Sequence, residues 1–375
     1  MKQQVSANQL TVGQPLPWDV FGHDGVLLLK RGQIIESQRA LDRFIEEGLY
    51  LQGNNFSSDE PVVIEQRTSA LQHVLDARRH MGTTFNHRPE IQDDFSGRME
   101  RSVQCVRSAC ESNALVSLSS ILLMQDIPYA VRHAVDTAIL ANVLAEALTV
   151  DIEARHDIIA AALTMNFGMY EVQEKIHSIQ GPLNEKLMSM IRSHPGIGAE
   201  RLEKLGINSS PWLTMVRQHH EHHDGSGYPA SLAGESITLG ARIIALADRY
   251  SAMVSARGYR GPQKPNAALR ELYVKHGQTI DVTVAGTLIR VLGLYPVGTL
   301  VRLVTGEIGV VTGAGETPDT PEVHAIMTKS GATLDVASHR KTHLSKFAIE
   351  EVITLDKLTI PVRMVAIWGK DAAVR

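Results

Sequence analysis

Apolar residues recur at helical spacing through the middle of the chain. In five stretches every third or fourth position is apolar, which predicts amphipathic or buried α-helices. Few strand signals interrupt them, so residues 114–294 are expected to form an all-α core that buries a substantial apolar interior. The five stretches are Val131–Leu148, Ile152–Thr164, Leu183–Leu205, Leu213–His223 and Leu239–Ser255.

The regions before this core have a different pattern. Val26–Leu29 reads as a short strand, and Ser37 is placed to cap a helix from Gln38 to Glu47. Residues 1–55 are therefore expected to form a small α+β regulatory or docking unit. Residues 56–113 begin with a polar, turn-rich stretch and become helical from about Arg67, which predicts a linker followed by a helical connector.

The region after the core is rich in β-formers separated by glycines, which predicts a β-hairpin appendage over residues 295–355. Its expected strands are Thr299–Val304, Ile308–Thr312, Glu322–Thr328 and Ala332–Val336. Residues 356–375 form a tail without a clear pattern. The expected fold class is multi-domain and mainly α, with an all-α helical core, a small N-terminal α+β unit and a C-terminal β-rich appendage.

Composition narrows the classes of function. The chain has 375 residues and a net charge of −4, so no bulk positive field recruits nucleic acid or an anionic membrane. Its start lacks the layout of a signal peptide, and no apolar run approaches the roughly 20 residues of a membrane span. A cytoplasmic location is expected, with Cys105 and Cys110 as reduced thiols. The oligomeric state is left open.

Histidine carries the strongest chemical signal. There are 16 histidines, and four of them lie in the string His219-His220-Glu221-His222-His223-Asp224-Gly225-Ser226-Gly227-Tyr228-Pro229. A lone histidine is more often a surface or hydrogen-bonded core residue than a metal ligand. Two adjacent imidazoles beside a glycine-rich turn are different, because they offer two nitrogens to one ion and have no packing rationale.

This string resembles the HHExxDGxGYP signature of HD-GYP proteins, a family of helical cyclic di-GMP phosphodiesterases. Other segments resemble further motifs of that family and occur in the same order, so the resemblance covers about half the chain. They are Arg132-His133, His194-Pro195-Gly196-Ile197-Gly198, Ala247-Asp248-Arg249-Tyr250-Ser251-Ala252 and Arg257-Gly258-Tyr259-Arg260.

The resemblance implies a site that holds two or three iron or manganese ions. By motif, one half-site would consist of His194, His219 and His220, and the other would include His133 and Asp248. Cyclic di-GMP would be bound by Tyr228, Arg257 and Arg260, although the two arginines alone also fit a solvated helix end. The exposed loop would dock diguanylate cyclase-type proteins through Asp224, Gly225, Gly227, Tyr228 and Pro229.

The chain departs from the family where the HD dipeptide is expected. Met165 and Asn166 occupy that position, Met169 replaces a lysine, and Ser251 replaces an aspartate. A neutral amide cannot bridge two ions as a carboxylate does, and a thioether binds hard cations poorly. The remaining histidines fit a single zinc or iron ion, or the site holds no metal.

Two functions from different classes follow. The first is a sensor or adaptor that binds cyclic di-GMP or partner proteins with weak or absent turnover. The second is an active metal-dependent phosphodiesterase that yields pGpG and GMP. A third reading, a helical domain acting on another nucleotide, also stays open.

Three further histidines need a placement. His156-Asp157 is a literal HD pair, but it lies nine residues before the expected position, or ~13 Å along a helix. It is therefore expected to be a surface pair. His222 and His223 fill variable positions of the signature and are expected to face solvent.

Overall fold

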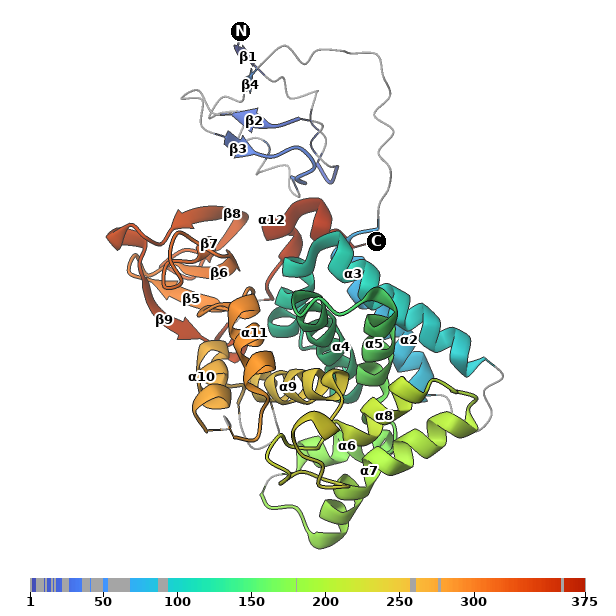
Figure 1. Ribbon diagram of the computed structural model, residues 1–375. Coiled ribbons are helices and arrows are strands. Elements are labelled where there is room, and N and C mark those ends of the chain that lie inside the picture. The colour runs from blue at the N-terminus through green and yellow to red at the C-terminus, as the bar shows by residue number, and fades with distance from the viewer. Residues whose placement is uncertain are drawn as a thin grey trace.

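The structure is a computed structural model that describes residues 68–86, 94–179, 181–256, 261–275, 278–358 and 361–374, with short stretches of residues 2–52. It is mainly helical, as predicted (Figure 1). The helices of the core are α2 (Ala70–Asn86), α3 (Phe95–Leu123), α4 (Tyr129–Ala147), α5 (Ile152–Thr164), α6 (Tyr170–Ser178), α7 (Glu185–Lys204), α8 (Ser210–Gln218), α9 (Leu239–Val254), α10 (Pro265–Lys275) and α11 (Val282–Leu292).

Helix α4 is the central element of the core. It packs against α2, α3, α5 and α9, and Ile139, Leu140 and Leu144 on it are fully buried. Burying an apolar side chain of this size stabilises the fold by about 1.5–3 kcal/mol. The neighbouring helix α5 begins where the Asp151 carboxylate accepts a hydrogen bond from the Ala154 amide at 2.9 Å.

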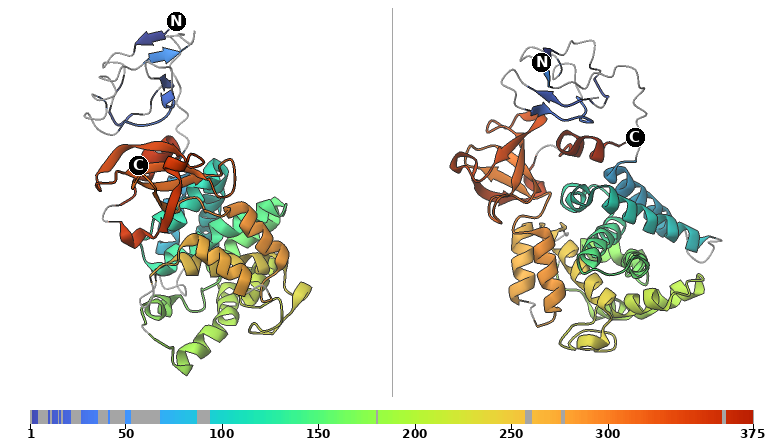
Figure 2. Two further views of the ribbon diagram at one scale, coloured as in Figure 1. Left: turned by 90° about the vertical axis from the view of Figure 1, so that its left-hand side faces the viewer. Right: turned by 45° about the horizontal axis from the view of Figure 1, so that its top comes forward.

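Two features of the core differ from the prediction. Helix α8 ends at Gln218 and not at His223, because the chain turns at His219 and His220 into the glycine-containing loop. Helix α6 was not predicted, since its nine residues carry only a short apolar pattern. Helices α6, α7 and α8 lie together at the end of the core opposite helix α12 (Met364–Trp368) (Figures 1 and 2).

The C-terminal region is an antiparallel sheet in the order β8-β7-β6-β5-β9. Four of its strands match predicted segments, namely β5 (Leu300–Leu303), β6 (Ile308–Gly313), β7 (Glu322–Met327) and β8 (Thr333–Lys341). Strand β9 (Ile349–Ile353) was not predicted. Leu300, Val310 and Ile353 of the sheet share an apolar cluster with Val116 and Leu123 of α3, which joins the sheet to the helical core.

The N-terminal strands form a second antiparallel sheet in the order β1-β4-β2-β3. The expected strand at Val26–Leu29 appears as β3. Of the expected helix from Gln38 to Glu47, Leu41 is described, as a buried helical residue, and the rest lies outside the described residues. The division of the chain into domains stays a prediction. None of the helices in the described ranges is both long and apolar enough to cross a bilayer. The strands are β1 (Lys2–Gln4), β2 (Val20–Phe21), β3 (Leu27–Leu29) and β4 (Tyr50–Gln52).

Candidate metal centre

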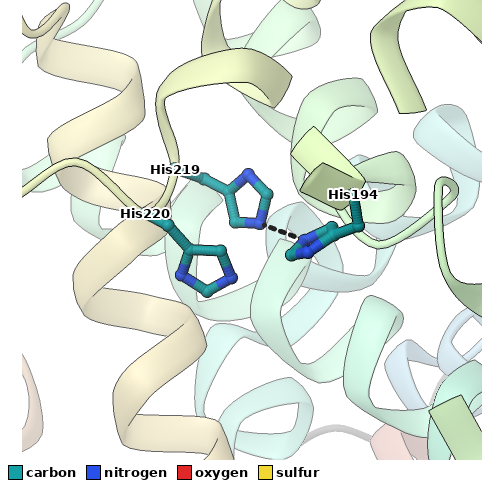
Figure 3. Close-up of side chains that lie close together, drawn as sticks. All are labelled: His194, His219 and His220. Carbon is teal, nitrogen blue, oxygen red and sulfur yellow. Dashed lines mark hydrogen bonds between the residues drawn. The ribbon is translucent and has the colours of Figure 1, made fainter. Parts of the chain in front are cut away.

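Three histidines from two helices converge at the α7–α8 end of the core. His194 lies on α7, His219 follows the last residue of α8, and His220 is next in the chain. One ring nitrogen from each lies within 4.8 Å of the other two (Figure 3). The adjacent pair can aim at one point because α8 ends at Gln218, so His220 is free of helical geometry.

Hydrogen bonds orient two of these rings. Nδ1 of His194 donates to the Ile191 carbonyl at 2.6 Å, and Nδ1 of His219 donates to the Val216 carbonyl at 2.7 Å. This assignment leaves a lone pair on each Nε2, and the two Nε2 atoms lie 3.1 Å apart. Two lone pairs at that distance repel each other unless a proton or a cation lies between them.

The donor set fits a divalent metal. Nitrogen ligands about 2.0–2.1 Å from a tetrahedral ion lie about 3.3 Å from each other. This is close to the 3.1 Å between the Nε2 atoms of His194 and His219. Burial, together with the neighbouring His219, lowers the pKa of His194 to about 3. Burial also lowers the pKa of His219 and His220. All three rings are therefore neutral near pH 7, the form that binds a metal.

A second pair of predicted ligands lies beside the three histidines. Nε2 of His133, on α4, is 2.7 Å from Oδ1 of Asp248, on α9. Burial alone would raise the pKa of Asp248, but the hydrogen bond and charge of His133 hold it well below its usual range. Asp248 is thus a fixed anion on the wall of the cavity, in the ionised form that a metal ligand requires.

One cavity of about 230 Å³ joins the two groups. His133, Asp248 and His220 all line it, together with Tyr228. Asn166 lines it too, with 8% of its surface exposed, and its side-chain amide has no hydrogen-bond partner among the described residues. Met165 is 1% exposed and packs in the apolar core, and Met169 lines the cavity.

Two glycines allow the Asn166 turn to approach α7. A Cβ on Gly168 would lie 2.7 Å from the Gly198 amide nitrogen and closer still to the His194 carbonyl oxygen. A Cβ on Gly198 would lie 3.1 Å from the Gly168 nitrogen. The two backbones therefore meet where a side chain would separate them, and this contact sets the position of His194 relative to Asn166.

The loop after the histidines is held in place by backbone and carboxylate hydrogen bonds. Glu221 accepts from the amides of Ala230 at 2.7 Å and Leu232 at 2.9 Å. The Tyr228 amide donates to the His220 carbonyl at 3.1 Å. The rings of Tyr228 and His220 have centroids 4.8 Å apart. Burial, with the charge of Asp248, raises the pKa of Tyr228, so its hydroxyl stays protonated.

The rest of this loop turns sharply. Asp224 accepts hydrogen bonds from the Ser226 amide at 3.0 Å and from its hydroxyl at 2.6 Å. Gly225 has φ +79°, which favours glycine, and a Cβ on Gly227 would collide with the backbone of residues 220–222. Asp224, Ser226 and Pro229 are exposed.

Some expectations fail or fall elsewhere. His222 and His223 are half-buried and not fully solvent-facing as expected. Arg249 donates to Nε2 of His222, and the His223 amide donates to the Thr279 carbonyl. Arg257 and Arg260 lie outside the described residues.

The literal pair His156-Asp157 lies apart from the cavity. His156 is bonded to Glu100 at 2.8 Å, and Asp157 accepts from Ser209 at 3.0 Å. Sequence reasoning missed Tyr129, Gln173 and His177, which also line the cavity. No motif marks them.

Sequence comparison relates this chain to a known domain family and to several named proteins. The sequence profile of the HD domain family matches residues 117–284. A cyclic di-GMP phosphodiesterase of Pseudomonas aeruginosa, PA4108, is 31% identical over 236 residues, which cover 63% of this chain and 54% of that protein. The response regulator RpfG of Xanthomonas campestris pv. campestris, also named a cyclic di-GMP phosphodiesterase, is 29% identical over 229 residues, covering 60% and 55%.

A third relative carries a different name. The 3′3′-cGAMP-specific phosphodiesterase 3 of Vibrio cholerae is 30% identical over 172 residues, covering 45% of this chain and 36% of that protein. The chain thus spans about half the length of the first two relatives and less of the third. The chain therefore contains a region similar to the HD domain over residues 117–284, and over about half of their length it is similar to proteins named cyclic di-GMP phosphodiesterases.

Proposed function

We propose that this chain is a cyclic di-GMP signalling protein that binds the nucleotide in the described cavity and hydrolyses it weakly or not at all. The proposal depends on one observation, namely that three groups of side chains lie at the same cavity. His220 of the three-histidine cluster, the His133–Asp248 pair and Asn166 all line one cavity, and His194 and His219 lie directly behind His220.

The surviving histidines favour one bound ion. His194, His219 and His220 supply three nitrogens and leave positions open for water or a phosphate oxygen. When bound, a divalent metal would act there as a Lewis acid on a phosphate. Zinc and iron both suit an all-nitrogen donor set, and the family resemblance adds manganese.

The second half-site is incomplete. His133 and Asp248 remain, but Asn166 brings a neutral amide where a carboxylate would bridge two ions. An amide donates and accepts hydrogen bonds but carries no charge to balance a second cation. Hydrolysis by in-line attack that requires two metal ions would therefore be much slower. Binding of the nucleotide would persist.

Binding requires less of the site than catalysis does. The Tyr228 hydroxyl remains protonated and can donate to a phosphate or a base. The cavity of about 230 Å³ is smaller than pockets of roughly 300–1,000 Å³ that enclose whole ligands. A cyclic dinucleotide would thus place one part inside and extend beyond the mouth.

The alternative function is an active metal-dependent phosphodiesterase that yields pGpG and GMP. The names of the relatives favour it. It requires that a single ion, or a second ion held without a bridging carboxylate, suffices for turnover. Docking of diguanylate cyclase-type proteins would use the loop of Asp224, Gly225, Gly227, Tyr228 and Pro229, of which Asp224 and Pro229 are exposed, and it does not depend on turnover.

Binding and turnover are separated by two parallel measurements. The purified chain is titrated with cyclic di-GMP by calorimetry, and the same sample is incubated with the nucleotide and Mn(II) or Fe(II) while products are separated chromatographically. We expect saturable binding with little linear product. His219→Ala tests dependence on the histidine cluster, and His156→Ala is the control at a surface histidine. Rapid pGpG formation that His219→Ala abolishes would establish the phosphodiesterase instead.

A further inference from the structure

Helix α6 buries one residue among those described, and that residue is polar. Gln173 is 5% exposed and lines the cavity. Its side-chain amide has no hydrogen-bond partner in the described part of the chain. The amide is not among the fully buried unsatisfied groups, so it reaches the cavity, where its donor and acceptor are available to a ligand that enters.

The same face of α6 forms one wall of the cavity. Gln173, Ile176 and His177 follow the i, i+3, i+4 spacing of neighbours on a helix, and all three line the cavity. Glu174 holds this wall in place, because its Oε1 accepts from the Ala130 amide at the start of α4 at 2.5 Å. The wall is thus fixed relative to the helix that carries His133.

Aromatic rings continue this wall. The rings of Tyr129 and His177 stack with centroids 3.7 Å apart and planes 10° apart. The rings of Tyr129 and His133 stack at 5.0 Å and 13°. Planar rings next to an unpartnered amide are the elements that recognise a nucleobase, since bases stack on aromatic side chains and hydrogen-bond through their edges.

We propose that Gln173, Tyr129 and His177 form a purine-base subsite in the cavity beside the metal centre. The proposal rests on the proposed function, since it assumes that a nucleotide enters this cavity. The base packs against the Tyr129–His177 pair, and the Gln173 amide hydrogen-bonds its Watson–Crick edge.

The amide group of Gln173 determines which purine bases the subsite accepts. The Gln173 oxygen accepts from N1–H of guanine while its nitrogen donates to O6, and the same amide accepts from N6–H of adenine while donating to N1. A carboxylate at this position would accept from guanine N1–H and N2–H but would have no donor for adenine. The subsite therefore admits both purines, so mixed guanine–adenine cyclic dinucleotides are ligands as well as cyclic di-GMP.

The test compares ligands that differ only in their bases. The full chain is titrated by calorimetry with cyclic di-GMP, 3′3′-cGAMP and cyclic di-AMP, and with GMP and AMP as single-base probes. In the unmodified chain, we expect the affinities for guanine and adenine ligands to agree within about tenfold. A bidentate base contact corresponds to roughly 5- to 100-fold in affinity. Gln173→Ala should weaken both classes by that factor.

Gln173→Glu is the sharper variant. Its added charge weakens all phosphate ligands alike, so the ratio of guanine to adenine affinity isolates the base contact, and this ratio should rise by roughly 5- to 100-fold. Gln104→Glu is the matched control, because Gln104 is an exposed glutamine on α3. Circular dichroism and bound metal, measured on every variant, show whether the fold and the histidine cluster are intact.

Each outcome has a definite meaning. An unchanged guanine-to-adenine ratio in Gln173→Glu, with fold and metal intact, overturns the subsite but leaves the proposed function standing. Binding of GMP or AMP without any cyclic dinucleotide overturns the proposed function, while the ratio for the mononucleotides still decides the subsite. Binding of none of the five ligands overturns both.

Discussion

The Arg249 guanidinium donates to Nε2 of His222 across 3.0 Å, joining two positions that the family motifs leave variable. Arg249 follows Asp248 on α9, and His222 lies in the loop after His219 and His220. Since His222 accepts at Nε2, its Nδ1 donates to the Ser226 hydroxyl at 2.9 Å, and that hydroxyl donates to Asp224 at 2.6 Å. A directed chain of hydrogen bonds thus ties the exposed loop to the helix of Asp248.

We expect Arg249→Ala to loosen this loop. The substitution removes the bonds to His222 and to the Thr279 hydroxyl, and hydrogen bonds to charged groups contribute about 1.5–3 kcal/mol. Amide hydrogen exchange should accelerate at residues 223, 225 and 228, whose amides are bonded within and around the loop. Arg302→Ala, which breaks the exposed pair with Glu351, is the control and should change stability by under about 1 kcal/mol. Unchanged exchange at the loop would show that Glu221 alone fixes it.

Bound metal should depend on the three histidines. His194→Ala or His219→Ala removes one of three nitrogens, and we expect metal per chain to fall at least tenfold after dialysis against a weak chelator. Elemental analysis by mass spectrometry measures it. His156→Ala should retain the metal content of the unmodified chain. Equal loss in all three variants would indicate that the metal is bound elsewhere.

Two glycines near the site should respond oppositely to alanine. In Gly168→Ala the new Cβ meets the backbone of α7, so we expect destabilisation of about 2–4 kcal/mol and reduced metal content. In Gly196→Ala the Cβ meets open space inside α7, so stability should be unchanged or rise by up to about 1 kcal/mol. Chemical denaturation of the two variants gives the comparison. Equal stability would mean that the turn at Gly168 shifts without cost.

Much of the fold was accessible from periodicity. The α5 bounds agree with the predicted stretch Ile152–Thr164, because Asp151 caps a strongly apolar run. Strand β9 was missed because Ile349–Ile353 mixes two glutamates into a short segment whose pairing with β5 comes from far away in the chain. Local pattern does not encode such a partner.

The site shows a similar division. Motif spacing identified His194, His219 and His220, but their convergence depends on where α8 ends and on how closely Gly168 approaches α7. Gln173 could not be singled out, since a glutamine in a charged nine-residue helix looks like a solvated residue until packing buries it. His222 was expected to face solvent and is half-buried, because Arg249, 27 residues later in the chain, donates a hydrogen bond to its ring.

Stability should fall with acid partly through His324 on β7. Burial, followed by the nearby His339, lowers the pKa of His324 to about 4, against about 6.5 in an unfolded chain. The unfolded state therefore binds a proton first, so this contribution to stability is full above about pH 6.5 and is lost as pH falls towards 4.

The matching variant is His324→Gln, compared with the unmodified chain by denaturation at pH 7 and pH 4.5. The unmodified chain should lose roughly 1–2 kcal/mol more than the variant, after solvent screening is allowed for. An equal loss in both proteins would place the acid sensitivity elsewhere.

Restoring the expected dipeptide should restore the second half-site. Asn166→Asp with Met165→His places a carboxylate in the cavity beside Asp248 and His133. Without metal, two neighbouring carboxylates repel each other and the free energy of unfolding should drop by about 1–3 kcal/mol. With Mn(II) present, the ion neutralises them, so the metal-induced rise in melting temperature should exceed that of the unmodified chain. Metal should rise from about one ion per chain to two.

The two single substitutions separate the effect of the added charge at position 166 from the effect of packing at position 165. Because Asn166 already lines the cavity, Asn166→Asp alone should supply most of the gain in metal, whereas Met165→His alone buries an imidazole in the apolar core and should only destabilise the fold. If Asn166→Asp binds no additional ion, the cavity face of Asn166 is not directed at the His133–Asp248 pair. The absent carboxylate would then not account for the weak hydrolysis that we propose.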